Sequence, residues 1–240
     1  MSRVAVVTGG TKGIGKAIAI ELRDAGYKVA VNYLQDDASA KAFKAETGIP
    51  VFRFDVGDHK SCRNGCEVIE ATVGPIDVLI NNAGITRDGT ISNMKIDDWN
   101  LVLRTNLTSC FNMSKAVFDG MKERNFGRIV SIGSVNGQAG QYGQVNYAAA
   151  KSGIHGFTKA LAHEGAKFNI TVNAVAPGYV KTDIVKAVPD VVLDKIISKI
   201  PVGRLGEAHD IARAVLFLIA EDATFVTGST LSINGGHHMY

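Results

Sequence analysis

The sequence has few features of proteins that form disulfides, cross membranes or bind nucleic acids. Its 240 residues include three cysteines, Cys62, Cys66 and Cys110, which cannot all pair with one another. No apolar run approaches the roughly 18–20 residues of a membrane span, and the first residues lack the apolar core and cleavage site of a signal peptide. The net charge is only +3, with basic residues scattered along the chain. These absences predict a cytoplasmic protein with reduced thiols and no membrane or nucleic-acid partner.

The sequence also lacks a convincing set of metal ligands. Cys62 and Cys66 are one helical turn apart, but no second pair of cysteine or histidine residues completes a zinc site. His237 and His238 are adjacent, so on an extended segment their side chains point to opposite sides. The pattern therefore predicts no metal site, and it predicts that the two histidines serve as contacts of the C-terminal tail.

The hydrophobic pattern alternates between short apolar runs and longer helical stretches. The short, β-branched runs predict strands over 3–8, 28–33, 51–54, 77–84, 128–134, 171–178 and 230–235. Helical spacing covers 14–24, 36–47, 59–72, 97–120 and about 146–166. Nearly continuous Val/Ile strands that alternate with helices are typical of a parallel sheet covered on both faces. We therefore expect a single α/β domain over 1–240, a Rossmann-type doubly wound sheet of about seven parallel strands. The irregular stretch over 179–206, with Pro189 and Pro201, has the length of a mobile flap over a ligand.

A glycine-rich loop, Thr8-Gly9-Gly10-Thr11-Lys12-Gly13-Ile14-Gly15, follows the first predicted strand. The segment 10–16 nearly matches the phosphate loop of nucleoside triphosphatases, but Ala17 stands where that motif needs Ser or Thr for magnesium. The alternative is a dinucleotide loop, in which glycines let the backbone approach a pyrophosphate at a helix N-terminus. The spacing G-x-x-x-G-x-G fits the general fingerprint only loosely, and a tight strand–helix turn is the structural alternative. The position of the glycine-rich loop after the first predicted strand favours dinucleotide binding.

The choice of dinucleotide follows from charge at the end of the second strand. An NAD site usually has an acidic residue there to bind the ribose hydroxyls, whereas this strand ends Asn32-Tyr33-Leu34. Asp36 and Asp37 come later and fit the start of the next helix better. Lys12 in the glycine loop can meet a 2′-phosphate. The sequence therefore predicts NADPH/NADP+ as the cofactor.

Tyr147 and Lys151 are four residues apart in a predicted helix, so their side chains share one face. A nearby ammonium favours the phenolate form of tyrosine, which lets a phenol exchange protons with a substrate oxygen near neutral pH. The spacing alone is weak, because a Tyr and a Lys four apart occur by chance on many helices. The pair becomes informative only together with the other motifs.

Together the motifs resemble the short-chain dehydrogenase/reductase family over essentially the whole chain. The residues that carry the resemblance are Thr8-Gly9 with Gly13-Ile14-Gly15, Asp55, Asn81-Asn82-Ala83-Gly84, Asn106, Ser134, Tyr147 with Lys151, Pro177-Gly178 and Asn234-Gly235-Gly236. The resemblance implies a reductase whose catalytic residues are Asn106, Ser134, Tyr147 and Lys151. It also implies the cofactor-binding residues Gly9, Thr11, Lys12, Gly13, Ile14, Gly15, Asn32, Asp55, Val56, Asn82, Ala83, Gly84, Tyr147, Lys151, Pro177 and Gly178.

Within the family the chain is most similar to the reductases that act on acetoacetyl-CoA in polyhydroxybutyrate synthesis. Segments 81–88, 134–162, 177–185 and 234–239 carry this similarity. It implies NADPH-dependent formation of (R)-3-hydroxybutyryl-CoA, with Asp88, Gln141, Gln144 and Tyr179 binding the acyl-CoA thioester. The chain departs from the pattern at Asn93, where a basic residue is expected.

Two alternatives remain open. Reductases of 3-oxoacyl groups on acyl carrier protein share the fold, the cofactor and the catalytic residues; a basic patch formed by Arg87, Arg104 and Arg128 would favour that acidic partner. The chain can also be a dinucleotide-binding scaffold without activity, although such proteins usually lose the Tyr or the Lys. Family relatives are usually homotetramers, and the small residues of the 147–165 helix (Ala148, Ser152, His155) are a candidate interface.

Overall fold

Seven parallel strands form one sheet in the computed structural model, which describes residues 2–181 and 190–239. The strands are β1 (Val4–Val7), β2 (Lys28–Tyr33), β3 (Val51–Arg53), β4 (Ile76–Asn81), β5 (Gly127–Ile132), β6 (Ile170–Pro177) and β7 (Thr230–Ile233). Their order is β3-β2-β1-β4-β5-β6-β7, and every neighbouring pair is parallel. The predicted doubly wound α/β sheet is therefore confirmed.

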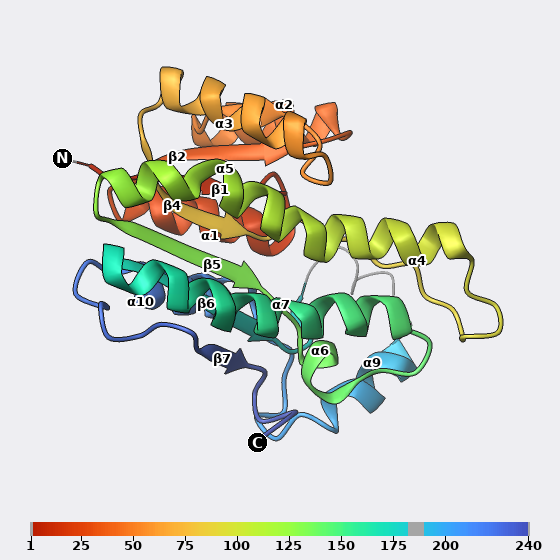
Figure 1. Ribbon diagram of the computed structural model, residues 1–240. Helices are drawn as coiled ribbons and strands as arrows, with labels where there is room; N and C mark the ends of the chain where they lie inside the picture. The colour runs from red at the N-terminus through yellow and green to blue at the C-terminus, as the bar shows by residue number, and fades with distance from the viewer. Residues whose placement is uncertain (1, 182–189, 240) are drawn as a thin grey trace.

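Helices cover both faces of this sheet (Figure 1). Helices α1 (Gly13–Asp24), α2 (Asp37–Thr47) and α10 (Ala208–Ile219) pack on one face, where Ile18, Phe43 and Val215 belong to one core cluster. Helices α3 (His59–Thr72), α5 (Ser109–Glu123) and α7 (Val145–Gly165) pack on the other face. Because successive strand residues point to opposite faces, Val6 and Val7 of β1 enter different clusters.

The predicted long helix over 97–120 is three elements in the structure. Helix α4 (Ile96–Leu103) runs into a π-helical turn over Arg104–Thr108, which leads into α5. The turn holds Asn106, whose Nδ2 donates to the Val102 carbonyl at 2.9 Å. A π-turn inside an α-helix is a frequent mark of a functional site.

Helix α10 and the short helices α6 (Val135–Ala139) and α9 (Asp190–Ile197) are additions to the predicted elements, as is a 3-10 turn at Ala166–Phe168. Helix α10 begins with a capping box, in which Glu207 accepts from the amide of the third helical residue and Asp210 accepts from the Glu207 amide. Of the predicted flap over 179–206, residues 182–189 lie outside the part of the chain that the structure describes.

The three cysteine thiols lie in the interior of the fold. Cys62, Cys66 and Cys110 are free and buried, and burial raises the pKa of Cys62 and of Cys66 to about 12. Among residues 2–181 and 190–239, no group of three or more His, Cys, Asp or Glu side chains could hold a metal ion. In the same residues no helix combines the length and the apolar character needed to span a membrane.

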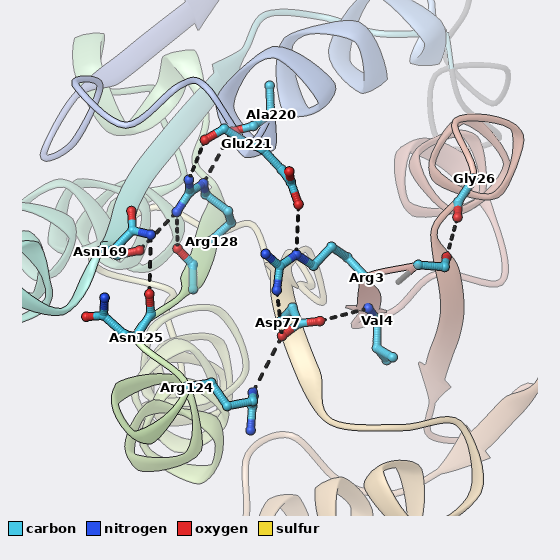
Figure 2. Close-up of polar contacts among 12 residues, drawn as sticks. Arg3, Val4, Gly26, Asp77, Arg124, Asn125, Arg128, Asn169, Ala220 and Glu221 are labelled. Carbon is cyan, nitrogen blue, oxygen red and sulfur yellow. Dashed lines mark hydrogen bonds and ion pairs between the residues drawn. The ribbon is translucent and has the colours of Figure 1, made fainter.

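Arg128 is buried at the amino ends of the strands, where its guanidinium donates to several backbone carbonyls (Figure 2). Its guanidinium donates to the carbonyls of Gly127 (2.8 Å), Asn169 (3.0 Å), Ala220 (3.3 Å) and Glu221 (3.1 Å). Two of these carbonyls lie just past α10 and one precedes β6, so a single side chain joins three segments. Arg128, a candidate for an exposed basic patch, is therefore buried and does not contribute to one.

We expect Arg128→Met to lower the Tm by roughly 5–15 °C in a chain of this length. Methionine fills the space but leaves buried carbonyls without donors, and each such acceptor costs about 1–3 kcal/mol. Thermal unfolding followed by circular dichroism measures the change. Arg63→Met is the matched control, because Arg63 is exposed and, in the part of the chain that the structure describes, forms only an i,i+4 pair with Glu67 on α3. Equal Tm values for the Arg128 variant and the control would contradict a stabilising role for these hydrogen bonds.

Candidate active site

The loops after β1 and β4 meet at the carboxyl edge of the sheet and are fastened together. Thr8 Oγ1 accepts from the amides of Asn82 and Ala83 at 2.9 and 3.0 Å, and it donates to the Ile80 carbonyl at 3.3 Å. Asn82 Nδ2 donates to the carbonyls of Thr8 and Gly9 at 2.9 and 3.1 Å. Strand β1 lies between β2 and β4, so this edge is the switch point at which doubly wound sheets bind their ligands.

The glycines of the first loop adopt backbone conformations and close approaches that side chains would disturb. Gly9 and Gly13 adopt φ values of +60° and +57°, a region that favours glycine. A Cβ on Gly15 would lie 2.6 Å from the Gly9 carbonyl oxygen. Helix α1 begins at Gly13, within this glycine-rich segment, and has no acidic residue in its first turn. Open backbone at a helix N-terminus suits a pyrophosphate, so these residues fit a dinucleotide.

The segment after β2 brings a negative charge close to Lys12. Asn32 is buried and its Nδ2 donates to the Phe54 carbonyl at 2.9 Å. Asp36 caps α2, as expected, by accepting from the Ser39 amide at 2.9 Å. Its other oxygen pairs with Lys12 Nζ at 3.2 Å. The Ser39 amide, the Ser39 hydroxyl and then Lys12 lower the pKa of Asp36 to about 2. Lys12 therefore lies beside the start of α2, where it is paired with an acid.

Asp55 and Val56 follow β3 and shape the next part of the same edge. Asp55 Oδ1 accepts from the Gly57 amide at 2.8 Å, while Oδ2 pairs with Arg104 at 3.2 Å. The Val56 carbonyl accepts from Asn112 Nδ2 of α5 at 3.1 Å. These bonds hold the loop after β3 beside the π-turn.

Lys151 lies at the centre of the predicted catalytic residues. It is 4% exposed, and its Nζ donates to the Ile132 carbonyl at 2.7 Å, where β5 ends. The same Nζ lies 5.6 Å from the centre of the Tyr147 ring. The helical spacing predicted from the sequence therefore does place the phenol and the ammonium side by side.

Ser134 and Asn106 lie on different elements, the start of α6 and the π-turn. Ser134 caps α6 two residues after Ile132, and its Oγ accepts from the Asn136 amide at 3.1 Å. Asn106 Nδ2 donates to the Ile85 carbonyl at 2.9 Å. A Cβ on Gly84 would lie 2.5 Å from Asn106 Oδ1 and 3.6 Å from Lys151 Nζ, so only glycine fits between these side chains.

Tyr179 follows Pro177 and Gly178 at the end of β6 and contacts the C-terminal tail. Its ring lies 5.6 Å from the ring of His237, a contact that agrees with the predicted tail role of that histidine. Burial, followed by the charge of Asp88, raises the pKa of Tyr179. A cavity of about 240 Å³ adjoins Tyr179 and is also lined by Arg204, Asp210 and Asn234.

The other predicted substrate residues divide into a bonded pair and a separate one. Gln144 Nε2 donates to Asp88 Oδ2 at 2.9 Å. Gln141 is exposed, and within the described residues its side chain makes no hydrogen bond to this pair. Asn136, which the sequence analysis missed, donates to Gln144 Oε1 at 2.9 Å. Its position two residues after Ser134 was the available signal.

The predicted interface on α7 is partly used within the chain. Ser152 Oγ donates to the Gly137 carbonyl of α6, and His155 Nδ1 bonds Thr230 Oγ1 of β7 at 2.9 Å. Two of the three small or polar residues proposed for contact with another subunit therefore bind elements of their own subunit.

A parallel sheet with an open glycine loop at its switch point and a Tyr–Lys pair beside it defines an oxidoreductase of the Rossmann class. The chain belongs to the short-chain dehydrogenase/reductase family: a family model described as "Enoyl-(Acyl carrier protein) reductase" matches residues 9–238.

Curated relatives cover nearly all of the chain. It is 59% identical over 98% of both chains to "Acetoacetyl-CoA reductase" of Shinella zoogloeoides. It is 56% identical over 99% of both chains to the protein of the same name in Rhizobium meliloti (strain 1021). It is 45% identical to "3-oxoacyl-[acyl-carrier-protein] reductase FabG" of Escherichia coli (strain K12), over 99% of this chain and 98% of the relative.

Proposed function

We propose that the protein reduces acetoacetyl-CoA to (R)-3-hydroxybutyryl-CoA with NADPH. The observation that carries the proposal is the arrangement around Lys151, which adjoins the Tyr147 ring, the end of β5 before Ser134, and Gly84 beside Asn106. The names of the relatives support the substrate, because those called acetoacetyl-CoA reductase are 46–59% identical, against 45–46% for those named for acyl carrier protein.

In this proposal the glycine loop and α1 bind the pyrophosphate, and the residues at the ends of β3, β4 and β6 line the rest of the dinucleotide. The nicotinamide, when bound, supplies the hydride to the ketone carbon. The ketone oxygen then gains negative charge, and Tyr147 donates its hydroxyl proton to that oxygen. Ser134 Oγ stabilises the same oxygen by a hydrogen bond, an electrostatic contribution that is often the largest in catalysis.

The proton that Tyr147 loses has to be replaced from solvent. Lys151 Nζ is held by the Ile132 carbonyl at 2.7 Å, which fixes the ammonium next to the phenol ring. Asn106 is held in the π-turn by the carbonyls of Ile85 and Val102. We propose that Asn106 positions a water that links Lys151 to solvent, so that the phenol regains its proton.

The paired state of the arginines gives little support to acyl carrier protein as a partner. Arg87 pairs with Asp98 at 3.8 Å and Arg104 with Asp55 at 3.2 Å. Arg128 is buried at the opposite edge of the sheet. The three basic residues that were candidates for a carrier-protein patch therefore offer little unpaired charge to an acidic partner.

Turnover of the two thioesters side by side tests the substrate. We expect a higher kcat/KM for acetoacetyl-CoA than for acetoacetyl-ACP, measured by the loss of NADPH absorbance. Crotonyl-CoA is a third arm, because the family description names an enoyl substrate. A clear preference for the carrier-protein thioester, or reduction of crotonyl-CoA alone, would contradict the proposal, and silence in every arm would favour a dinucleotide-binding scaffold.

Cofactor choice is tested at Lys12. If Lys12 leaves Asp36 to bind a 2′-phosphate, Lys12→Ala should lower kcat/KM with NADPH by about tenfold, the loss of roughly one charge-assisted hydrogen bond. NADH, which lacks that phosphate, should change little. Asp36→Asn should shift preference further toward NADPH because it removes a competing negative charge. Equal losses with both cofactors in Lys12→Ala would contradict the assignment.

Location, assembly and the flap are further proposals. We propose a cytoplasmic homotetramer in which exposed apolar side chains, Phe111 of α5 (51% exposed) and Phe217 of α10 (56% exposed), contribute to contacts between subunits. We also propose that Tyr179, at the start of the predicted flap, contacts the substrate beside Asp88, whose charge raises the pKa of Tyr179 after burial does. Gln141 is proposed to join the substrate contacts from its exposed position.

A further inference from the structure

Three side chains connect the loop after Gly84, helix α6 and the start of α7. Asn136 Nδ2 donates to Gln144 Oε1 at 2.9 Å, and Gln144 Nε2 donates to Asp88 Oδ2 at 2.9 Å. The backbone amide of Asn136 also donates to Ser134 Oγ at 3.1 Å. The chain of bonds therefore runs from the proposed catalytic serine to an acid beside Tyr179.

The chemistry of the two neighbours determines which way the Gln144 amide points. A carboxylate only accepts hydrogen bonds, so the Gln144 atom that faces Asp88 must be the nitrogen. The oxygen then faces Asn136, which must present its own nitrogen. Nε2 carries two hydrogens, and the bond to Asp88 uses one of them. The second hydrogen is left to donate to a ligand.

One backbone bond and one side-chain bond hold the same loop against the start of α7, on either side of Gln144. The Gly89 amide donates to the Gly143 carbonyl at 2.8 Å. Asn146 is fully buried, and its Nδ2 donates to the Arg87 carbonyl at 2.9 Å. Asn146 Oδ1 accepts from the Tyr147 amide at 2.7 Å. Gln144 is thus fixed three residues before the proposed proton donor.

We propose that Asn136 is a positioning residue that keeps Gln144 Nε2 as a donor to a carbonyl of a 3-oxoacyl thioester. The inference rests on the proposed function, and it assigns Asn136 a part in recognising that class of substrate. Asn136 acts through Gln144. Asp88 is its counterpart at the other end, and the direction of donation from Asn136 through Gln144 to Asp88 is what makes the amide useful.

Reversing that direction separates recognition from local stability. In Asn136→Asp, Gln144 lies between two carboxylates, so its oxygen faces one of them; we expect a lower Tm and a raised KM. In the double variant with Asp88→Asn, the Gln144 amide can turn over, because the amide introduced at position 88 donates to Oε1 and the carboxylate introduced at position 136 accepts from Nε2. The network is restored with the opposite polarity. The Tm should return toward that of the wild type, while Nε2 no longer faces the substrate.

The experiment measures Tm, KM and kcat for wild type, Asn136→Val, Asn136→Asp and the double variant, with acetoacetyl-CoA and acetoacetyl-ACP. We expect KM to rise by about tenfold in each variant, the loss of one positioned hydrogen bond, with a smaller change in kcat. Gln138→Leu is the matched control, because Gln138 lies on the same helix and bonds Ser232 of β7 instead; its KM should stay at the wild-type value.

The outcomes separate the role of Asn136 from the proposed reductase function. An unchanged KM in Asn136→Val, beside normal wild-type turnover, would overturn the role of Asn136 alone. Recovery of KM together with Tm in the double variant would also overturn it, because Asn136 would then act only through local stability. Absence of wild-type turnover with both thioesters would overturn the proposed function and this inference with it.

Discussion

Tyr147→Phe should lower kcat by about 10²–10⁴-fold, the range that a positioned general acid contributes, while the Kd for NADPH stays the same. Phenylalanine keeps the ring that lies 5.6 Å from Lys151 Nζ, so the packing around the ammonium is retained and only the hydroxyl proton is lost. Single-turnover oxidation of NADPH measures the chemical step, and fluorescence titration measures cofactor binding.

Tyr27→Phe controls for the general effect of removing a phenol. Tyr27 precedes β2, at the amino end of the strands and away from the glycine loop. Its substitution should leave turnover unchanged. If Tyr147→Phe retained most of the wild-type rate, Tyr147 would not be the proton donor.

Lys151→Met should abolish most activity without lowering the Tm. The residue is 4% exposed, and within the described residues its Nζ has one hydrogen-bond partner, the Ile132 carbonyl, and no ion pair. Burying an ammonium in this way is unfavourable, and an apolar side chain of similar length removes that cost. Activity should fall by about 10²–10⁴-fold, because the phenol loses its charged neighbour.

The comparison of Tm and kcat makes this prediction specific to a functional site. Lys159→Met is the control, because Lys159 lies on the exposed side of the same helix and should change neither quantity. A large drop in the Tm of Lys151→Met would show that the ammonium stabilises the fold. Substantial remaining activity would remove it from the proposed mechanism.

Much of the fold follows from local patterns in the sequence. Short Val/Ile runs between helical stretches predicted all seven strands, and the central strands β1, β4, β5 and β6 are buried on both faces and need no polar side. Helix α10 was missed although its signal was present: Ile211, Val215 and Leu218 recur at helical spacing after the capping box of Glu207 and Asp210.

Other features depend on segments that are distant in the sequence. Arg128 reads locally as an exposed cation in a strand, but its partners are carbonyls of Asn169, Ala220 and Glu221, which only the folded chain brings near. The side-chain amide of Asn106, within the π-turn, donates to the Ile85 and Val102 carbonyls, and Ile85 belongs to a separate segment of the chain. Neither arrangement has a local pattern.

In the candidate site, too, local spacing predicts some contacts and the folded chain determines the others. The four-residue spacing of Tyr147 and Lys151 was enough to predict their contact, because helical geometry decides it. The pairing of Lys12 with Asp36 follows from the adjacency of β1 and β2, which the sequence did not specify. Asn136 escaped notice because its importance depends on where Gln144 and Asp88 lie.

The most direct test of the proposed reaction is to follow the hydride. Wild-type protein is incubated with acetoacetyl-CoA and NADPH in which both hydrogens at C4 are replaced by deuterium, and the product is analysed by mass spectrometry and chiral chromatography. The proposal predicts (R)-3-hydroxybutyryl-CoA with deuterium on C3, formed in step with NADPH oxidation. Product without deuterium on C3, the opposite configuration, or no product at all would contradict it.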